Sequence, residues 1–448
     1  MSIFKDCDIR GVYGKELFEA DGYRVGRALS TLVPSARIRV GGDVRLSTPA
    51  LKARLVEGLV AGGARVEDMG TIATPMMYFA IHGGAADGGA MVTASHNPAK
   101  YNGIKFMLGD RPVTREEMDA LRAIAESGDF RDGEGGVSPL DILPAYLGSL
   151  EARFGTAARG VVVVDAGNGA MSKVAPAAFR QAGYRVAELF CEPDGSFPNR
   201  TPNPAEHGQL DALRAKVIEE AADFGVAFDG DGDRAVFVDD RGEAVASERA
   251  LVLFIRHLLK DGPSAVVYDQ KSSSVVRRAI LEMGGTPAPE RSGHTFIKHR
   301  FLDLNAAVAG EVSGHFFFGE LGYDDALFAG LLMGEALTRS GRRMSEALAG
   351  VVCPPITPDL RIPYAYDRQQ ALLDRLEAAY AGRPISKMDG VRVELEGGWL
   401  LMRKSVTAEQ MTLRIEGEDR AALERIARDL AKKIPETAAA LESITIPA

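Results

Sequence analysis

Short apolar runs, each followed by a polar turn and then by apolar residues at helical spacing, recur along most of the chain. The run Val161–Val164 is continuous and β-branched, which is typical of a strand buried in a parallel sheet. The short runs Arg37–Val40 and Ala265–Asp269 lead into similar turns, and the segments 48–60 and 274–283 behind them have the helical pattern. Strand, turn and helix form the α/β unit, so three such units predict three similar domains with mostly parallel, mixed sheets.

The last quarter of the chain has a different pattern. A proline-rich connection, 356–366, leads into a helical segment, and the apolar runs 391–396 and 399–403 flank a glycine pair, which predicts a hairpin. A further strand at 411–415 and a long helix at 420–434 complete a predicted smaller α+β domain. The fold class is therefore α/β, with three similar domains and a C-terminal α+β domain. The predicted domain boundaries are 1–145, 146–245, 246–354 and 355–448.

Length, charge and cysteine content narrow the class of protein. A chain of 448 residues is too long for one hydrophobic core. The net charge of −9 without any Lys/Arg-rich block argues against nucleic acid and against anionic membranes as partners. Three well-separated cysteines argue against a disulfide framework or a zinc site. The N-terminus lacks a signal-peptide pattern, and no apolar run approaches the ~18 residues of a membrane span, so we expect a soluble cytoplasmic protein.

The loop Thr93–Pro98 is the first candidate for chemistry. An apolar strand end at 89–92 runs into small and polar residues and a proline, so Ser95 is predicted on a turn, beside a histidine. A turn is a good mount for a nucleophilic hydroxyl, although an ordinary polar loop fits the same residues. Lys105 follows a tight turn shortly afterwards and could be a general base, an anion contact or a surface lysine.

The second candidate is the segment Asp229–Arg234, which follows a predicted strand at 224–228. Its three alternating carboxylates repel one another, and a hard divalent cation with oxygen ligands resolves that repulsion better than a solvated acidic turn does. The spacing does not fit an EF-hand, because Arg234 and Asp240 stand where that loop needs glycine and glutamate. The segment therefore predicts Mg²⁺ bridging to a phosphate, with Arg234 on the same anion.

Two further loops carry polar residues at strand ends. In 310–315, after a predicted strand at 306–309, Glu311, Ser313 and His315 alternate and could hold sugar hydroxyls while His315 moves protons; a structural loop is an equal alternative. His294 lies in a Ser-Gly-flanked loop, which argues against a core histidine. Arginine and two hydroxyls in the C-terminal domain make a phosphate clamp or a plain strand edge, and these residues are Arg403, Ser405 and Thr407.

Together these loops resemble the α-D-phosphohexomutase family, most closely its bacterial phosphomannomutase/phosphoglucomutase branch, and the resemblance covers essentially the whole chain in order. Phe4–Gly11 is similar to the family's N-terminal Asp-Ile-Arg-Gly segment, and Thr93–Pro98 to its phosphoserine loop. The other matches are Asp229–Arg234 to the metal loop, Gly310–His315 to the sugar loop and Arg403–Thr407 to the phosphate loop. The family fold places three related α/β domains and a fourth domain around a central cleft.

The resemblance implies an isomerase of carbohydrate metabolism. A phosphorylated Ser95 would exchange its phosphoryl group with O1 or O6 of mannose or glucose phosphate through a hexose 1,6-bisphosphate, which also serves as activator. Mg²⁺ would be held by Ser95 and the triplet Asp229, Asp231 and Asp233. The catalytic group would be Ser95, Lys105, His315 and Arg10. The substrate contacts would be Glu311, Ser313, His294, Lys271, Arg234, Arg403, Ser405 and Thr407. Hexose phosphates are the only partners expected, and the chain would be a monomer or a weak homodimer.

Departures from the family pattern leave alternatives open. The phosphate loop continues as Val406–Glu409, which lacks the usual proline and adds a carboxylate beside the expected anion. A phosphoglucosamine mutase is one alternative, although that branch tends to have glutamine where this chain has Val312. A phosphosugar-binding regulatory protein with weakened turnover is another. A hydrolase using Ser95 and His96 is disfavoured, because adjacent residues rarely reach nucleophile–base geometry.

Overall fold

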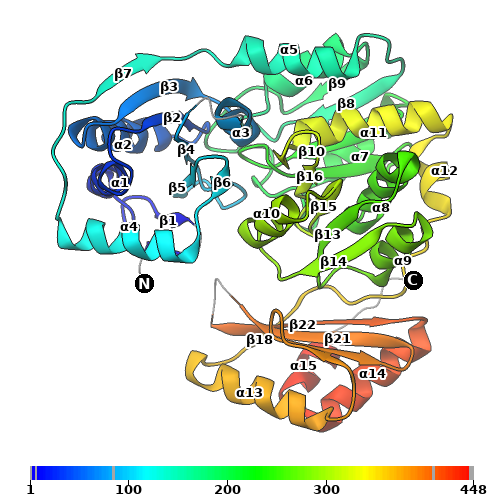
Figure 1. Ribbon diagram of the computed structural model, residues 1–448. Coiled ribbons are helices and arrows are strands. Elements are labelled where there is room, and N and C mark those ends of the chain that lie inside the picture. The colour runs from blue at the N-terminus through cyan, green and yellow to red at the C-terminus, as the bar shows by residue number, and fades with distance from the viewer. Residues whose placement is uncertain (1–2, 6–7, 83–85, 406–408, 443–448) are drawn as a thin grey trace.

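The computed structural model describes residues 3–5, 8–82, 86–405 and 409–442. In this part of the chain the strands form four sheets, one in each of four successive domains (Figure 1). The first three sheets are mixed and carry helices, and the fourth is antiparallel. This is the predicted fold class of three α/β domains followed by a smaller α+β domain.

The bounds of the elements are as follows. The first domain contains β1 (Ile9–Val12), α1 (Glu19–Leu32), β2 (Arg37–Gly42), α2 (Thr48–Ala61), β3 (Arg65–Thr71), α3 (Thr74–Ile81), β4 (Gly88–Val92), β5 (Tyr101–Leu108), β6 (Arg111–Pro112), α4 (Arg115–Ser127) and β7 (Gly136–Pro139). The helix α5 (Leu143–Phe154) leads into the second domain, with β8 (Val161–Asp165), α6 (Val174–Gln181), β9 (Arg185–Leu189), α7 (Asp211–Glu219), β10 (Phe224–Phe228), β11 (Ala235–Asp239) and β12 (Ala244–Val245).

The third domain contains α8 (Ser247–Leu258), η2 (Leu259–Asp261), β13 (Ala265–Asp269), α9 (Ser274–Glu282), β14 (Thr286–Glu290), α10 (His294–Asp303), β15 (Val308–Gly310), β16 (Phe316–Phe318), β17 (Tyr323–Asp324), α11 (Ala326–Ser340) and α12 (Met344–Ala349). The fourth contains β18 (Leu360–Pro363), α13 (Tyr366–Ala379), β19 (Ile385–Ser386), β20 (Val391–Leu395), β21 (Gly398–Lys404), β22 (Gln410–Gly417), α14 (Arg420–Lys433), η3 (Pro435–Thr437) and α15 (Ala438–Glu442).

The first three sheets share one topology. Each has a parallel triplet with the earliest strand in the centre, in the orders β3-β2-β4, β9-β8-β10 and β14-β13-β15. Beyond the third strand of each triplet lie two antiparallel strands, in the orders β5-β1, β11-β12 and β16-β17. The internal repeat that three α/β units indicated is therefore present in the fold, and the carboxyl ends of β4, β10 and β15 are equivalent positions.

One apolar core runs through the first three domains, and the fourth has its own. Buried side chains of α3, α6, α8 and α11 belong to the same cluster, including Met76, Phe179, Phe254 and Phe328. A separate cluster fills the space between the fourth sheet and its helices. In Figure 1 the fourth domain, orange to red, lies below the third. Among the described residues, no helix combines the length and apolar composition that crossing a bilayer requires.

One predicted strand starts later than expected. The apolar residues 306–309 predicted a strand over that range, but β15 begins at Val308. Asn305 takes a left-handed conformation with φ of 46°, and the Ala306 N–H donates to Phe301 O, so these residues close α10 instead. Apolar alanines fit a helix end and a strand start equally well, so the pattern could not place this boundary.

Candidate active site

The loops that carry the candidate residues leave the same strand in each repeat. Ser95 follows β4, the triplet Asp229–Asp233 follows β10, and the segment Glu311–His315 follows β15. Each loop lies at the carboxyl end of the last parallel strand, just before the chain turns back antiparallel, which is where open α/β sheets hold their ligands. The topology brings a serine, a set of carboxylates and a histidine together from three domains.

Ser95 is held on a strained turn by a buried arginine. Its φ of 50° is left-handed, a conformation that residues other than glycine adopt mainly under constraint. The Arg45 guanidinium donates to the carbonyls of Ser95 and Asn97, each at 2.6 Å, and to two more carbonyls of the loop. The Ser95 N–H donates to Thr93 Oγ1 at 2.8 Å. The loop is therefore rigidly mounted.

The serine hydroxyl meets the carboxylate triplet directly. Ser95 Oγ donates to Asp229 Oδ2 at 2.8 Å, and both side chains are buried. The other oxygen of Asp229, Oδ1, accepts the backbone N–H groups of Gly232, Asp233 and Arg234 at 3.0 to 3.2 Å. One oxygen thus shapes the metal loop while the other faces the serine.

Positive charge from the first domain meets the remaining two carboxylates. Lys105 Nζ, on β5, lies 2.9 Å from Asp231 Oδ2 and 2.6 Å from Asp233 Oδ2. Burial alone would lower the pKa of Lys105, but Asp231 and Asp233 raise it overall, so this lysine is a cation here. The threonine Thr74 at the start of α3 also donates to Asp231 Oδ2, at 2.7 Å.

The triplet fits a divalent cation. Its three carboxylates are fully buried, and suitable ligand atoms lie within 4.8 Å of one another. Asp231 Oδ1 and Asp233 Oδ1 are buried without a hydrogen-bond partner, which is costly unless another group takes them. Burial, then the charges of Asp233 and Asp231, raise the pKa of Asp229 well above its usual range, whereas Lys105 and His315 lower the pKa of Asp233 despite its burial. These residues form an acidic metal-binding triad.

His315 links the metal loop to Glu311 of its own loop. Its Nε2 lies 3.3 Å from Asp233 Oδ1, and its Nδ1 lies 3.1 Å from Glu311 Oε2. Burial would lower the pKa of His315, but Asp233 and Glu311 raise it to about 9. Ser313 Oγ donates to the same Glu311 oxygen at 2.6 Å, while Glu311 Oε1 is buried without a partner. The free oxygen can accept a hydrogen bond from a sugar hydroxyl.

Two arginines place positive charge around the Ser95 loop. Arg234 Nε lies 3.4 Å from His315 Nε2 and 3.9 Å from Asp229 Oδ2. Arg10, on β1, pairs with Asp8 and has a buried Nε without a hydrogen-bond partner. The charge of Arg234, burial and the charge of Arg10 lower the pKa of His96 well below its usual range. This neighbourhood favours an anion over a further cation.

The remaining candidates line the contact between the third and fourth domains. Lys271 Nζ lies 3.0 Å from Asp359 Oδ2, and Arg403 pairs with Asp389. The same Asp389 oxygen accepts the backbone N–H of Ser292 at 3.2 Å. Lys271 and Arg403, both predicted substrate contacts, are therefore each paired with a carboxylate of the fourth domain.

The end of the predicted phosphate loop lies partly outside the described residues. Ser405 is buried and its N–H donates to Gln410 O at 3.0 Å, whereas Thr407 is outside the described residues. The Glu409 carboxylate, expected as a like charge beside the anion, accepts the N–H of Tyr366 at the start of α13 at 3.2 Å. The glutamate thus stabilises a helix N-terminus.

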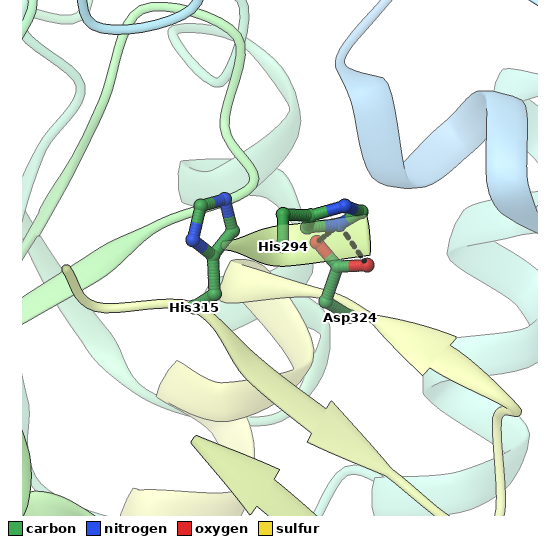
Figure 2. A group of neighbouring side chains, drawn as sticks. All are labelled: His294, His315 and Asp324. Carbon is green, nitrogen blue, oxygen red and sulfur yellow. Dashed lines mark hydrogen bonds and ion pairs between the residues drawn. The ribbon is translucent and has the colours of Figure 1, made fainter. Parts of the chain in front are cut away.

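His294 lies beside His315 at the start of α10 (Figure 2). The two ring centroids are 5.0 Å apart. His294 Nε2 lies 2.9 Å from both carboxylate oxygens of Asp324, on β17. The structure thus brings His294 to the same place as Glu311 and Ser313.

Several residues that shape this site were missed at the sequence level. They are Arg45, Thr74, Lys298, Asp324 and Asp389. Arg45 and Thr74 act on groups about 50 and 157 positions away along the chain. Asp324 and Asp389 look like ordinary turn acids. Only Asp43 and Arg45 stand at a place that could be noticed, just after a predicted strand. Nothing around them in the sequence indicates which groups they contact.

A buried serine hydroxyl beside carboxylates that suit a divalent cation, with basic side chains from β1, β5 and the loops after β10 and β15, defines a phosphoryl-transfer enzyme. Each of the three repeated domains supplies one part of the site: Ser95, the acidic triplet and the loop Glu311–His315.

Comparison with known proteins identifies the family. Residues 1–132, 145–242 and 246–352 match the phosphoglucomutase/phosphomannomutase alpha/beta/alpha domains I, II and III. The chain is 37% identical over 433 residues to the phosphomannomutase/phosphoglucomutase of Pseudomonas aeruginosa PAO1, covering 95% of this chain and 94% of that protein. It is 38% identical over 436 residues to the phosphoglucomutase of Neisseria gonorrhoeae, covering 95% of each.

A solved structure supports the same family. A phosphoglucomutase/phosphomannomutase family protein from Burkholderia thailandensis superimposes with a TM-score of 0.90 at 34% identity, covering 100% of this chain and 99% of that chain. The chain therefore belongs to the phosphoglucomutase/phosphomannomutase family, and the family that the loop motifs indicated is confirmed.

Proposed function

We propose that this protein interconverts the 1-phosphate and 6-phosphate of mannose and/or glucose through a phosphorylated Ser95. The observation that carries the proposal is the 2.8 Å hydrogen bond from Ser95 Oγ to Asp229 Oδ2, which sets the hydroxyl against the acidic triplet. The names of the relatives from Pseudomonas and Neisseria support mannose and glucose phosphates as substrates.

In the proposed reaction, the phosphoryl group passes from Ser95 to the hexose. A hydroxyl of the bound hexose monophosphate, O6 or O1, attacks the phosphorus of phosphorylated Ser95. The new bond joins that oxygen to phosphorus, the bond from phosphorus to Ser95 Oγ breaks, and Oγ ends as a free hydroxyl. The proton of the attacking hydroxyl passes to a base, and a general acid donates the proton that Oγ takes up. The product is a hexose 1,6-bisphosphate, and returning its other phosphate to Ser95 completes the isomerisation.

The residues around Ser95 divide the remaining tasks. We assign proton transfer to Lys105 and His315, with Arg10 contributing charge beside the serine. Mg²⁺ would be held by Asp229, Asp231, Asp233 and an oxygen at Ser95, and when bound it supplies positive charge to the transferring group. The two unpartnered oxygens of the triplet support that assignment. A hexose 1,6-bisphosphate would act as activator by phosphorylating Ser95 at the start.

The substrate would be held at both ends. Glu311, Ser313 and His294 would bind sugar hydroxyls, and Arg234 would lie on the transferring phosphate. The phosphate that is not being transferred would lie between the third and fourth domains, on Lys271, Arg403, Ser405 and Thr407. The pairing of Lys271 and Arg403 with carboxylates of the fourth domain supports this placement, because a phosphate can replace those anions.

The test is Ser95→Ala. We expect loss of isomerisation by about a thousandfold or more, because the variant lacks the proposed phosphoryl acceptor, while the melting temperature changes little. Mannose, glucose and glucosamine 1-phosphates are compared with Mg²⁺ and a trace of hexose bisphosphate. A preference for glucosamine phosphate would support the phosphoglucosamine mutase alternative, and tight binding without turnover would support a regulatory protein. Appreciable turnover by Ser95→Ala would rule out the serine mechanism.

A further inference from the structure

A buried lysine that the proposed function leaves unused lies next to the sugar-recognition histidine. Lys298 follows His294 by one turn on α10, so the two side chains lie on one face of the helix. Its side chain is fully buried. Burying an ammonium group costs considerable free energy unless other groups offset its charge, and an apolar side chain would fill the same space more cheaply.

The surroundings of Lys298 come from two domains. Its Nζ lies 3.6 Å from the centre of the Tyr78 ring on α3 and 3.7 Å from Met107 Sδ on β5, both in the first domain. From the third domain, Asp324 Oδ1 lies 3.6 Å away, and that carboxylate is also fully buried. The lysine therefore fixes the buried carboxylate from one side while it contacts the domain that carries Ser95.

The same carboxylate holds His294 from the other side. His294 Nε2 lies 2.9 Å from both Asp324 oxygens, as the dashed lines in Figure 2 show. Although burial alone would raise it, the charges of His294 and Lys298 lower the pKa of Asp324, so the carboxylate is ionised between two donors. An ionised partner at Nε2 keeps the proton on that nitrogen and leaves Nδ1, on the other side of the ring, facing away from Asp324.

The cluster of His294, His315 and Asp324 is not well suited to a metal ion. His294, His315 and Asp324 could in principle hold a cation, since suitable atoms lie within 4.8 Å of one another. However, the Lys298 ammonium already lies beside Asp324, and both nitrogens of His315 face carboxylates, Asp233 and Glu311. The cluster already contains its own positive charge.

We propose that Lys298 is a positioning residue, which acts through Asp324 to hold the His294 ring so that Nδ1 is presented to a sugar hydroxyl. The proposal rests on the proposed function, in which His294 binds the hexose. Because Lys298 packs on Tyr78 and Met107, it also ties the position of this histidine to the first domain. Without the lysine, Asp324 is a buried charge with one partner fewer, and it moves or takes up a proton.

The test is Lys298→Met, which keeps an unbranched side chain one atom shorter and removes its charge. We expect KM for hexose 1-phosphate to rise about tenfold or more, as for loss of a charge-assisted hydrogen bond. The Mg²⁺ concentration for half-maximal activity should stay unchanged, since the triplet is untouched. Nitrogen-15 NMR should show His294 losing its single Nε2–H tautomer, with the signal assigned through His294→Gln. Lys173→Met, at an exposed lysine of the second domain, is the matched control.

A second variant covers the case in which Lys298→Met does not fold. Asp324→Asn keeps the size of the carboxylate and leaves the lysine in place, and it should produce the same rise in KM and the same tautomer change. In a folded double variant the two effects should not add, because both substitutions break one chain of contacts. Independent, additive effects would contradict action through Asp324.

The outcomes separate this inference from the proposed function. If Ser95→Ala loses isomerisation while Lys298→Met keeps both the wild-type KM and the His294 tautomer, the positioning role is wrong and the function stands. A lower melting temperature with unchanged KM and tautomer would likewise reduce Lys298 to packing. If Ser95→Ala keeps its activity, the function itself is wrong.

Discussion

At the scale of single residues, Lys105 and the acidic triplet determine how a cation enters the site. The ammonium of Lys105 bonds Oδ2 of Asp231 and Oδ2 of Asp233, and it leaves both Oδ1 atoms to other groups, with His315 Nε2 3.3 Å from Asp233 Oδ1. A divalent ion can therefore use the Oδ1 atoms without first displacing the lysine.

Asp231→Asn should weaken Mg²⁺ binding. Removing one of three charges should raise the Mg²⁺ concentration for half-maximal activity by at least about tenfold, while the Thr74 contact can be kept by the amide oxygen. The measurement is a Mg²⁺ titration of initial rate, with Asp194→Asn, an exposed aspartate of the same domain, as control. An unchanged titration curve would mean that the cation binds elsewhere.

The residues that sequence reasoning found and missed differ in one physical respect. Ser95, the triplet and the Glu311 loop each follow a strand directly, and local apolar runs and glycines mark that place. Arg45 and Lys298 act on groups far along the chain or in another domain, so nothing in their own neighbourhood describes their partners. The sequence therefore predicted the residues of the site better than the residues that hold them in position.

At the scale of elements, buried helix ends add pH-dependent stability. Asp325 caps α11 by accepting the N–H of Phe328 at 2.9 Å, and its other oxygen accepts the hydroxyl of Tyr146 at 2.7 Å. Burial raises the pKa of Asp325 to about 7. The folded state therefore binds this proton more tightly than the unfolded state, whose carboxyl has a pKa of about 4.

The sign of the resulting pH effect can be measured. The contribution of the Asp325 proton is complete below about pH 4 and is lost as the pH rises through about 7. Asp325→Asn keeps an acceptor for the cap but does not titrate. Relative to the wild type, its melting temperature should therefore improve between about pH 5 and pH 8. A difference between the two proteins that stays constant over this range would show that Asp325 is ionised throughout.

The elements themselves were largely predictable. The strand at 224–228 was placed at the observed bounds, and the long C-terminal helix was off by one residue at its end. Apolar period and β-branched runs mark such elements because each buries one face or both. The common order of the three sheets was not readable, since strand pairing depends on contacts distant in the sequence.

At the scale of the whole molecule, Asp389 joins the third and fourth domains at the expected phosphate site. One of its oxygens takes both the Arg403 guanidinium and the Ser292 N–H, and its backbone carbonyl accepts from Gln270 Nε2 at 3.0 Å. Ser292 Oγ nearby is buried without a partner. A carboxylate thus occupies donors that, under the proposed function, would face the substrate phosphate.

Asp389→Asn should therefore tighten substrate binding. Removing the competing charge should lower KM for hexose 1-phosphate about two- to fivefold, whereas Arg403→Ala should raise it about tenfold or more. Steady-state kinetics measure both, with Asp367→Asn, at an exposed position of the fourth domain, as the control. Should Asp389→Asn raise KM as Arg403→Ala does, the aspartate supports the site instead of competing for it.

The predicted domain boundaries and the expected monomer or weak homodimer stay predictions. In the molecule as a whole, loops from different domains converge on one site. Three loops from equivalent strands meet at the acidic triplet, through the contacts Ser95–Asp229 and His315–Asp233. The central claim is that phosphate moves between Ser95 and a hexose at this meeting point.

Phosphorus NMR of a single turnover tests that claim most directly. Protein phosphorylated with hexose 1,6-bisphosphate and freed of excess is mixed with one equivalent of mannose or glucose 1-phosphate and Mg²⁺. We predict that the phosphoserine signal is replaced transiently by hexose 1,6-bisphosphate and that hexose 6-phosphate accumulates, with no such signals from Ser95→Ala. Formation of hexose 6-phosphate by Ser95→Ala under the same conditions would contradict the account.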